Sequence, residues 1–265
     1  MIPKIIHYCW ISENVNDKLP EKVQECINTW KQYLPDYEIK RWNQYNFDIS
    51  NSIYAKQALD CKKYAFVSDY IRLSVLYRYG GIYLDTDMKV LKGFNDLLDN
   101  KFFVGFETSK MVATCIIGAE KNNILVKELL DVYKNKYFIN NNGNLNIIPN
   151  TVLMTEVLKK HNIKINNTLQ RNKYLTIYPI EYFCPYENNT GELNLTENSY
   201  AIHLYNGSWV DEKVFEFNEN SRKYYSFLKK GLPKKIAIYF ASYMATYKMK
   251  GIKGIFFRLY KRILG

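Results

Sequence analysis

Residues 64–91 constrain the fold most strongly, because they read as a helix, a double glycine and a short apolar strand in immediate succession. The first part has apolar residues at helical spacing, and Gly80–Gly81 follows it as a C-terminal cap. The run Ile82–Leu84 then reads as a buried strand, and Asp85 and Asp87 come directly after it. This succession of helix and strand is typical of an α/β domain.

The rest of the chain continues the alternation of strands and helices. Further strands are expected at residues 3–11, 37–42, 101–107, 112–119, 175–183 and 200–205, and a strand resumes after the aspartates, before residue 91. Helices are expected at 21–34, 52–61, 62–79, 123–138 and 151–161. This pattern predicts a single Rossmann-like α/β domain at 1–228, with a mixed, mainly parallel sheet, and a helical tail at 229–265.

The positive charge of the chain is concentrated in that tail. Residues 229–265 contain ten Lys and Arg residues and no acidic residue, so they account for ten of the net charge of +11. The preceding residues are close to neutral, with a net charge of +1. A nucleic-acid-binding function is therefore not expected, because the basic character belongs to one segment.

Cysteine usage and hydropathy favour a reducing compartment. The five cysteines are an odd number and form no CxxC pair, so neither a disulfide framework nor a zinc site is expected. The first residues, MIPKIIHYCW, are too short an apolar run for a secretory signal, and no stretch is long enough to span a membrane. We therefore expect a cytoplasmic protein.

The aspartate pair suggests a cation site. In an extended chain, Asp85 and Asp87 would point to the same side, beyond the carboxyl end of a strand, where open α/β sheets bind ligands. Oxygen ligands suit Mg²⁺ or Mn²⁺. A solvated turn would also explain the two carboxylates, and an ordinary intrahelical ion pair would explain Asp69 and Arg72 in the preceding helix.

The context of the pair resembles a known family. The stretch FVSDYIRLSVLYRYGGIYLDTDMKVL is similar to the signature of the DXD-containing, sugar-binding family 32 glycosyltransferases. These include capsule and lipopolysaccharide transferases and the yeast initiating mannosyltransferase, and they are related to the glucosylating domains of the large cytotoxins. The opening IPKIIHYCW and the later AIHLYNGSW also resemble this family. The resemblance implies a GT-A type fold.

The resemblance also implies roles for individual residues. Those expected to act in catalysis are Asp69, Arg72 and Asp85; those expected to contact the nucleotide-sugar are Trp10, Ser68, Tyr83, Ser208 and Trp209; those expected to hold the metal are Asp85, Asp87 and His203. Trp10 would stack on the base and Tyr83 would touch the ribose region. His203 as a ligand departs from the cytotoxin pattern, and a structural hydrogen bond at a strand end would also account for it.

These expectations together describe a transferase. The resemblance implies a metal-dependent, retaining enzyme that moves a hexose from a nucleotide-diphosphate sugar, UDP-hexose by default, to a hydroxyl of a glycan or lipid-linked oligosaccharide. The expected setting is capsule, exopolysaccharide or lipopolysaccharide synthesis. Two alternatives stay open: a haloacid-dehalogenase-like phosphatase, whose motif is also a strand ending in DxD, and a catalytically inactive adaptor at a membrane surface.

The tail is expected to bind a membrane surface. The stretch IKGIFFRLYKRIL places Ile252, Ile255, Phe256 and Leu259 at helical spacing, with basic residues off that stripe. Such a helix can lie in the interface of an anionic membrane. This predicts a peripheral protein on the inner face of the plasma membrane, although a helical hairpin packed on the domain would also fit the pattern.

Overall fold

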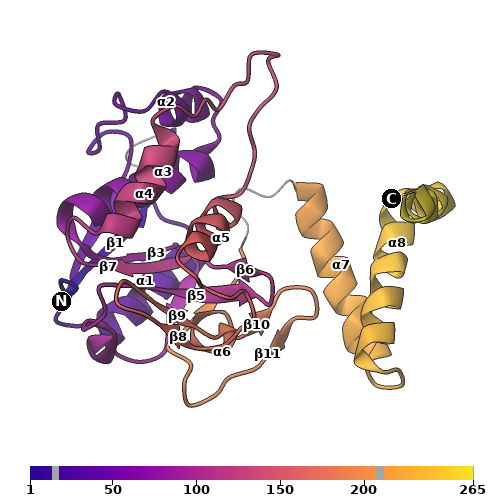
Figure 1. The fold of residues 1–265 in the computed structure, drawn as a ribbon. Coiled ribbons are helices and arrows are strands. Elements are labelled where there is room, and N and C mark those ends of the chain that lie inside the picture. Colours follow the sequence, from indigo (N-terminus) through magenta and orange to yellow (C-terminus); the bar gives the residue numbers. More distant parts are fainter. Residues whose placement is uncertain (14–17, 207–211, 265) are drawn as a thin grey trace. The chain divides into compact units, whose positions relative to one another are not determined.

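The computed structural model describes residues 1–13, 18–206 and 212–264, which form two units (Figure 1). The first consists of Met1–Pro185 and Leu195–Leu204, and the second of Tyr186–Asn194 and Tyr205–Gly265. The boundary predicted between residues 228 and 229 falls between the two long helices of the second unit, α7 (Glu212–Leu228) and α8 (Lys234–Leu264).

The first unit is built around one mixed sheet. Its strands are β1 (Ile5–Cys9), β2 (Glu38–Trp42), β3 (Gly81–Leu84), β5 (Phe102–Thr108), β6 (Met111–Val112), β7 (Ile116–Ala119), β8 (Gln170–Arg171) and β9 (Thr176–Tyr178). The order across the sheet is β2-β1-β3-β7-β5-β9-β8, with β6 paired to β5. The strands β2, β1, β3, β5 and β9 run in one direction, whereas β7 is antiparallel to both of its neighbours.

Helices cover both faces of this sheet. The helices are α1 (Glu21–Tyr33), α2 (Ile53–Asp60), α3 (Tyr64–Tyr79), α4 (Ile124–Tyr133), α5 (Asn150–Lys160) and α6 (Ile180–Phe183), with a 3-10 turn, η1, at Asn95–Leu97. Helices α2 to α5 pack on the face that carries Tyr83 and Val104 (Figure 1). Helices α1 and α6 pack on the opposite face, with Ile82 and Phe103. Because neighbouring strand residues point to opposite faces, a strand buried on both sides needs a continuous apolar run.

The double glycine connects helix α3 to strand β3 as predicted. Gly80 caps the helix with φ 68°, and Gly81 has φ 108°. Both angles are ones that residues with a side chain rarely adopt. A Cβ atom on Gly81 would also lie 2.6 Å from the carbonyl oxygen of Ile5. Glycine is therefore required here both by the turn and by the close approach of strand β1.

Two predicted strands differ from the observed structure. The expected strand at 175–183 ends at Tyr178, and α6 begins after Pro179, whose fixed φ suits the start of a helix. The expected strand at 112–119 is split into β6 and β7. The chain between them, which includes Thr114 and Cys115, supplies groups to the candidate site described below.

A second, small sheet lies beside the main one. It pairs β4 (Met88–Val90) with β12 (Ala201–His203) in antiparallel orientation, so that His203 lies opposite Met88. Helix α1 holds β4 in place through Trp30, whose indole N–H donates to the carbonyl of Met88 at 2.6 Å, and through Thr29, whose hydroxyl accepts from the backbone N–H of Val90 at 3.0 Å.

The second unit contains a helical hairpin and a short β-hairpin. The β-hairpin joins β10 (Tyr186–Glu187) to β11 (Glu192–Leu193), and the sequence analysis did not anticipate it. Helices α7 and α8 pack around Tyr225 and the small residues Ala237 and Ala241. Helix α8 is broken at Gly251, which has φ 61° and ψ −164°.

Acidic residues of the β-hairpin pair with basic residues of the tail. Lys234 lies 2.6 Å from Glu187 and 3.0 Å from Glu192, and Lys229 lies 3.2 Å from Glu192. The hydroxyl of Tyr225 also donates to Glu192 at 2.9 Å. The tail itself has no acidic residue, so these two of its lysines form their ion pairs with glutamates of the β-hairpin. No helix within the described residues is long and apolar enough to cross a bilayer.

The neutral state of His7 should make folding sensitive to acid. Its Nε2 lies 2.8 Å from the carbonyl oxygen of Gly80, and its Nδ1 accepts from the indole N–H of Trp42 at 3.0 Å. These contacts require Nε2 to carry the proton. Burial is the main cause that lowers the pKa of His7 from 6.5 to about 4. In the unfolded chain His7 therefore gains a proton as the pH falls below about 6.5, while in the folded protein it stays neutral until about 4.

We expect this difference to remove stability as the pH falls from about 6.5 to about 4, by up to about 3 kcal/mol. The measurement is the free energy of unfolding in denaturant across this pH range, compared with that of His7→Gln, which cannot take up the proton. A wild-type curve parallel to that of the variant would mean that His7 does not control the acid response.

Candidate active site

Asp85 and Asp87 lie at the carboxyl end of strand β3, where the sheet also presents the ends of β1 and β5. The sequence analysis assumed that the chain is extended between them, and this is wrong. The chain turns here, and the backbone N–H of Met88 donates to the carbonyl of Asp85 at 3.1 Å. This turn sends the chain into β4. The two carboxylates therefore approach each other across a turn and not along one side of a strand.

The pairing of β4 with β12 brings His203 to the aspartates. The backbone N–H of Leu204 donates to the carbonyl of Asp87 at 3.1 Å, which continues the ladder past the end of β12. The Nε2 atom of His203 lies 3.4 Å from Oδ1 of Asp87. A residue from the far end of the domain is thus fixed beside the aspartate pair by strand register.

Asp85, Asp87 and His203 form a group suited to a divalent cation. Each offers one ligand atom, and these atoms lie within 4.8 Å of one another. Their side chains are partly open to solvent, with exposed fractions of 27%, 15% and 12%. Two carboxylates and an imidazole fit Mn²⁺ or Mg²⁺, and the accessible positions would leave room for water or phosphate oxygens. The donor set thus fits the metal site that the sequence analysis predicted.

The guanidinium of Arg72 organises the buried side of this group. One of its terminal nitrogens lies 3.0 Å from Oδ1 of Asp69 and 3.3 Å from Oδ1 of Asp85. The other donates to the carbonyl of Thr114 at 2.7 Å. Its plane also lies over the ring of Tyr83, with 4.6 Å between the guanidinium carbon and the ring centroid. Arg72 is 5% exposed, so these protein groups supply the partners that water would otherwise provide.

Asp69 is held by residues that the sequence analysis did not single out. The amide of Asn150 donates to Oδ1 of Asp69 at 2.6 Å, and the hydroxyl of Thr114 donates to the amide oxygen of Asn150 at 2.7 Å. Burial raises the pKa of Asp69 to about 6, and the charge of Arg72 opposes this rise. Asn150 is the first residue of helix α5, and no pattern in the sequence around it indicates this contact.

The predicted donor-binding residues are placed as follows. Trp10 follows the end of β1, is half-buried, and has an indole nitrogen with no hydrogen-bond partner among the described residues. The hydroxyl of Ser68 donates to the carbonyl of Ala65 at 2.7 Å and lies 3.3 Å from Arg72. Tyr83 is 1% exposed and its hydroxyl donates to Oδ1 of Asp85 at 3.1 Å, so the structure gives it a protein partner. Their contacts with a donor stay predictions.

Two of the predicted residues, Ser208 and Trp209, lie outside the described residues. A further acid, Glu107, comes near the site from the end of β5. Burial is the main cause that raises its pKa, and the charges of His203, Asp85 and Asp87 also act on it. It went unnoticed in the sequence because a single glutamate at the end of a strand carries no pattern.

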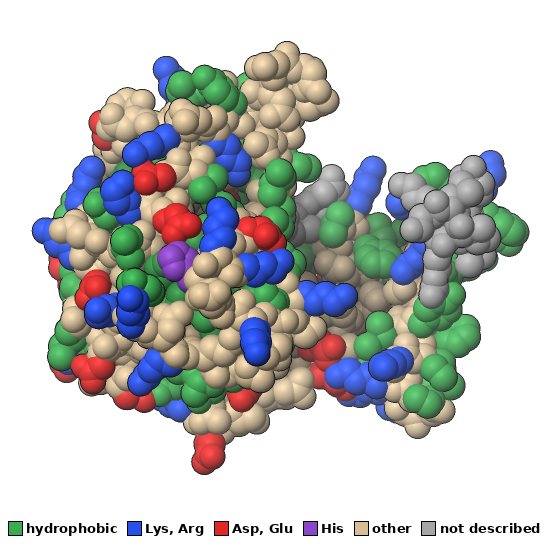
Figure 2. All heavy atoms as spheres, in the orientation of Figure 1, with side chains coloured by type: hydrophobic (Ala, Val, Ile, Leu, Met, Phe, Trp, Pro, Cys, Tyr) green, Lys and Arg blue, Asp and Glu red, His purple; other side chains and the backbone are tan. Residues whose placement is uncertain are grey.

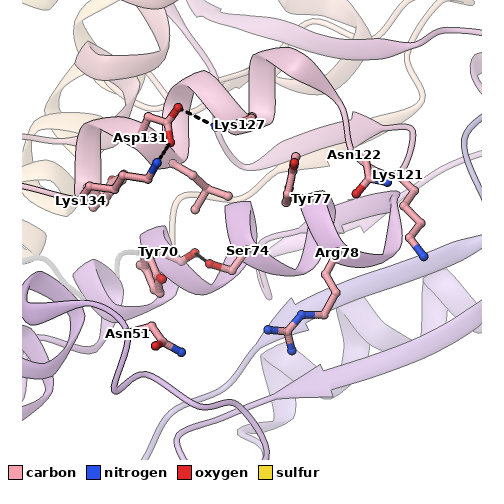
Figure 3. A pocket seen from close by; sticks show the side chains of 12 residues that line it. Asn51, Tyr70, Ser74, Tyr77, Arg78, Lys121, Asn122, Lys127, Asp131 and Lys134 are labelled. Atoms are coloured by element: carbon pink, nitrogen blue, oxygen red, sulfur yellow. Dashed lines mark hydrogen bonds and ion pairs between the residues drawn. The ribbon is translucent and has the colours of Figure 1, made fainter.

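Two pockets in the described part of the chain lie away from this cluster. The larger, about 600 Å³, is lined by helices α3 and α4 and carries the basic side chains of Arg78, Lys121, Lys127 and Lys134 (Figure 3). Lys127 and Lys134 both pair with Asp131 there. The second, about 530 Å³, lies between His161 and Tyr174. Neither contains a residue predicted to act on the donor, so the site rests on the side-chain cluster alone.

Sequence comparison relates this chain to glycosyltransferases. Residues 20–104 match the family described as glycosyltransferase sugar-binding region containing DXD motif. An uncharacterized glycosyltransferase, L373, of Acanthamoeba polyphaga mimivirus is 27% identical over 229 residues, which cover 79% of this chain and 84% of that protein. Inositol phosphoceramide mannosyltransferase 3 of Schizosaccharomyces pombe is 28% identical over 138 residues, which cover 51% of this chain but only 37% of that protein.

Among solved structures, one named PaToxG glycosyltransferase is similar to this chain over 60% of this chain and 70% of that one, with a TM-score of 0.49 and 24% sequence identity.

The family match contains Asp69, Arg72, Asp85 and Asp87. His203 and Trp10 lie outside it.

We expect Arg72→Lys to destabilise the protein by about 2 kcal/mol or more, because a lysine cannot contact Asp69, Asp85 and Thr114 at once with a planar fork. The measurement is the free energy of unfolding in denaturant. The matched control is Arg78→Lys, which changes an exposed arginine of the same helix and should have little effect. Equal stability of the two variants would mean that the Arg72 contacts contribute no more to the free energy of unfolding than an ordinary surface ion pair does.

Proposed function

We propose that this chain is a glycosyltransferase of the kind with a DXD-containing sugar-binding region, to which its residues 20–104 are similar. In this proposal it is a metal-dependent, retaining enzyme that transfers a hexose from a nucleotide-diphosphate sugar to a hydroxyl group. The observation that carries this proposal is the convergence of Asp85, Asp87 and His203, whose ligand atoms lie within 4.8 Å of one another. They stand at the sheet edge where α/β proteins bind nucleotides.

The metal in this proposal is Mn²⁺ or Mg²⁺, held by Asp87 and His203 with Asp85 beside them. When bound, such a cation would supply Lewis-acid stabilisation of the negative charge on a departing diphosphate. The role of Arg72 is then one of positioning. It neutralises and orients Asp85 from the buried side, together with the hydroxyl of Tyr83, so that the carboxylate faces the donor without reorganising.

The reaction proposed is substitution at the anomeric carbon with retention of configuration, as the family resemblance implies. The bond from the anomeric carbon to the phosphate oxygen breaks, and a bond to the acceptor oxygen forms on the same face of the sugar. The acceptor hydroxyl gives its proton to the departing phosphate oxygen. In this scheme the protein side chains hold the donor and exclude water, and none of them forms a covalent bond to the sugar.

The donor and acceptor are proposed by class. A UDP-hexose is the first donor to test, and GDP-mannose belongs beside it because relatives in Schizosaccharomyces pombe are named as mannosyltransferases. Their name also contains a lipid, inositol phosphoceramide. This supports an acceptor hydroxyl that belongs to a lipid-linked molecule. A glycan or lipid-linked oligosaccharide as acceptor, and synthesis of a capsule, exopolysaccharide or lipopolysaccharide as the setting, are proposed from the family resemblance alone.

A phosphatase of the haloacid dehalogenase class is less compatible with the site. That chemistry needs the first aspartate of the motif as a free nucleophile, whereas Oδ1 of Asp85 accepts from Tyr83 at 3.1 Å and lies 3.3 Å from Arg72. The family match also favours the transferase over an adaptor that lacks catalysis.

The decisive assay is hydrolysis of a panel of nucleotide sugars with Mn²⁺, Mg²⁺ or chelator, using the wild type and Asp87→Asn. We expect slow, metal-dependent hydrolysis of one donor, and a loss of at least about a hundredfold in the variant. Its unfolding free energy should change by no more than about 1 kcal/mol, because the substitution removes one of two neighbouring negative charges.

Asp99→Asn, at an exposed aspartate, serves as the control and should keep wild-type turnover. Full activity of Asp87→Asn would remove the metal assignment. Cleavage of phosphate monoesters in place of nucleotide sugars would indicate the phosphatase, and neither activity would indicate the adaptor.

The second unit is proposed to attach the enzyme to the cytoplasmic face of an anionic membrane. Beyond the break at Gly251, two members of the predicted stripe, Ile252 and Phe256, are 64% and 65% exposed. Ile255 is half-buried, and the side chain of Leu259 lies outside the described part of the chain. Phe257, which the stripe did not include, is 61% exposed. Lys250 and Lys253 are exposed beside them. Figure 2 shows hydrophobic side chains next to Lys and Arg side chains over the helices of this unit. Exposed apolar residues next to basic ones are the features by which interfacial helices bind anionic lipid.

We expect the full chain to sediment with vesicles that contain anionic lipid, and sedimentation to decrease with salt because the basic residues contribute by charge. The double substitution Ile252→Ser with Phe256→Ser should release most of the protein, since it removes exposed apolar area without disturbing a core. Phe227→Ser, at a 71% exposed position of α7, is the control. A wild type that stays in the supernatant at low salt would refute membrane attachment.

A further inference from the structure

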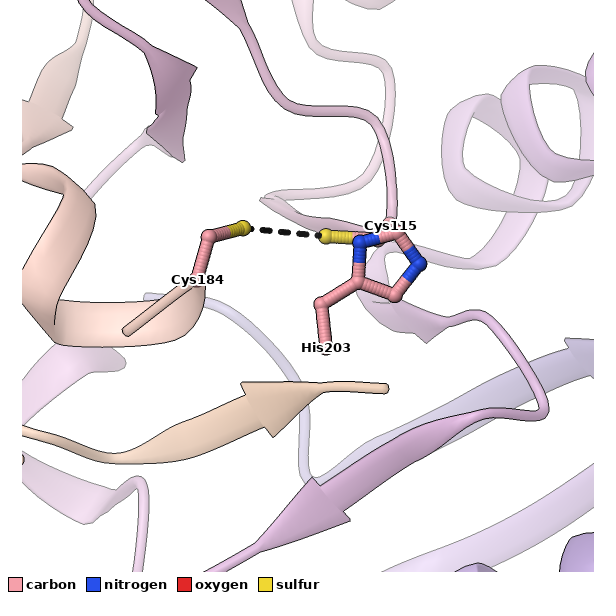
Figure 4. Close-up of side chains that lie close together, drawn as sticks. All are labelled: Cys115, Cys184 and His203. Carbon is pink, nitrogen blue, oxygen red and sulfur yellow. Dashed lines mark hydrogen bonds between the residues drawn. The ribbon is translucent and has the colours of Figure 1, made fainter. Parts of the chain in front are cut away.

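Cys115, Cys184 and His203 form a second cluster next to the aspartates, and its two cysteines have no part in the function proposed above. Cys115 immediately precedes β7, Cys184 follows α6, and His203 ends β12 (Figure 4). Their ligand atoms lie within 4.8 Å of one another. The cysteines are 3% and 2% exposed.

The spacing of the two sulfurs matches a tetrahedral metal site. Cys115 Sγ and Cys184 Sγ are 3.7 Å apart. Two thiolates that each lie about 2.3 Å from one tetrahedral zinc ion are separated by about 3.8 Å. A disulfide would require the sulfurs to move to about 2.05 Å. The thiols are therefore already spaced for a shared metal ion, although the sequence, with no CxxC, gave no reason to expect one.

We propose that Cys115, Cys184 and His203 bind a thiophilic divalent ion of the zinc type, with the fourth position of the tetrahedron left to water. Thiolate and imidazole are the ligands that Zn²⁺ prefers, whereas Mn²⁺ and Mg²⁺ prefer oxygen. Binding releases the two thiol protons to solvent, because only thiolates act as ligands. The burial of the sulfurs shields the ion from solvent on one side.

His203 makes this site exclusive with the oxygen-rich one. Its Nε2 lies 3.4 Å from Asp87 Oδ1, and its ring also interacts with the Cys115 side chain. A neutral imidazole has one nitrogen with an available lone pair and one N–H, so it can ligate one ion at a time. Zinc at the thiols therefore withdraws His203 from the aspartates and weakens Mn²⁺ binding there. This last consequence rests on the metal site of the proposed function.

The direct test is titration of the reduced wild-type chain with Co²⁺, which reports sulfur ligation by a charge-transfer absorption. We expect one thiolate-ligated ion per chain, displaced by Zn²⁺, which binds such ligands more tightly than Co²⁺. Cys115→Ser and Cys184→Ser should each abolish the absorption and weaken zinc binding by at least about tenfold. Loss of a residue that only supports a metal ligand already weakens metal binding by about tenfold or more, and loss of the ligand itself should cost at least as much. Cys61→Ser, at a partly exposed cysteine outside the cluster, is the control.

The pattern across metals separates this proposal from the previous one. Asp87→Asn should weaken only Mn²⁺ binding, the Cys115 and Cys184 variants only Zn²⁺ binding, and His203→Ala both. Mn²⁺ binding without any cobalt–thiolate absorption would overturn the zinc site alone. Cobalt–thiolate absorption without Mn²⁺ binding would overturn the proposed catalytic metal alone. If the serine variants do not fold, the wild-type cobalt spectrum decides: its absence refutes the site and its presence supports it.

Discussion

The site depends on the ion pairs and the hydrogen bond made by the buried guanidinium of Arg72. Taking a charge out of water is costly unless ion pairs and hydrogen bonds replace the solvent. Here Asp69, Asp85 and the carbonyl of Thr114 do so, and these groups belong to a helix, a strand end and a loop. Because each partner sits on a different element, satisfying Arg72 fixes the distance between those elements. The orientation of Asp85 then follows from the packing of the domain.

Strand register supplies the other half of the site. The pairing of β4 with β12 places His203 opposite Met88, one residue after Asp87. A slip of one residue would turn the histidine to the other face of the strand. The bonds from α1 to β4, made by Trp30 and Thr29, fix the position of the strand on which β12 pairs. A helix near the start of the chain therefore stabilises the geometry of a ligand near the end of the domain.

His203 lies where two kinds of ligand meet. Oxygen ligands stand on one side and the thiols of Cys115 and Cys184 on the other. Hard and soft ligands favour different metals. If both proposed sites bind their ions, the shared histidine links the metal content of the protein to the availability of each ion. In the two proposals, the same residue serves a reaction at the aspartates and responds to the presence of a thiophilic metal.

Several elements of the domain could be predicted from local patterns in the chain. Helix α3, the Gly80–Gly81 connection and the strand before Asp85 were all read from spacing and residue type, because helix periodicity and the need for positive φ act within a few residues. The DXD motif and Arg72 were found in the same stretch through their resemblance to a family. Patterns of this kind also predicted the α/β class. The observed elements depart from the predicted ones near Pro179 and at the split into β6 and β7, and strand β8, the β10–β11 hairpin and helix α7 were not predicted.

The contacts between residues far apart in the sequence could be seen only in the folded domain. Nothing local to Asn150 indicates Asp69 as its partner, and nothing near Cys115 indicates Cys184, which is 69 residues away. The turn after Asp85, which replaced the expected extended chain, also depends on β4 finding β12. Such contacts arise from the free energy of packing and of strand pairing over the whole domain, and no short stretch of sequence contains that information.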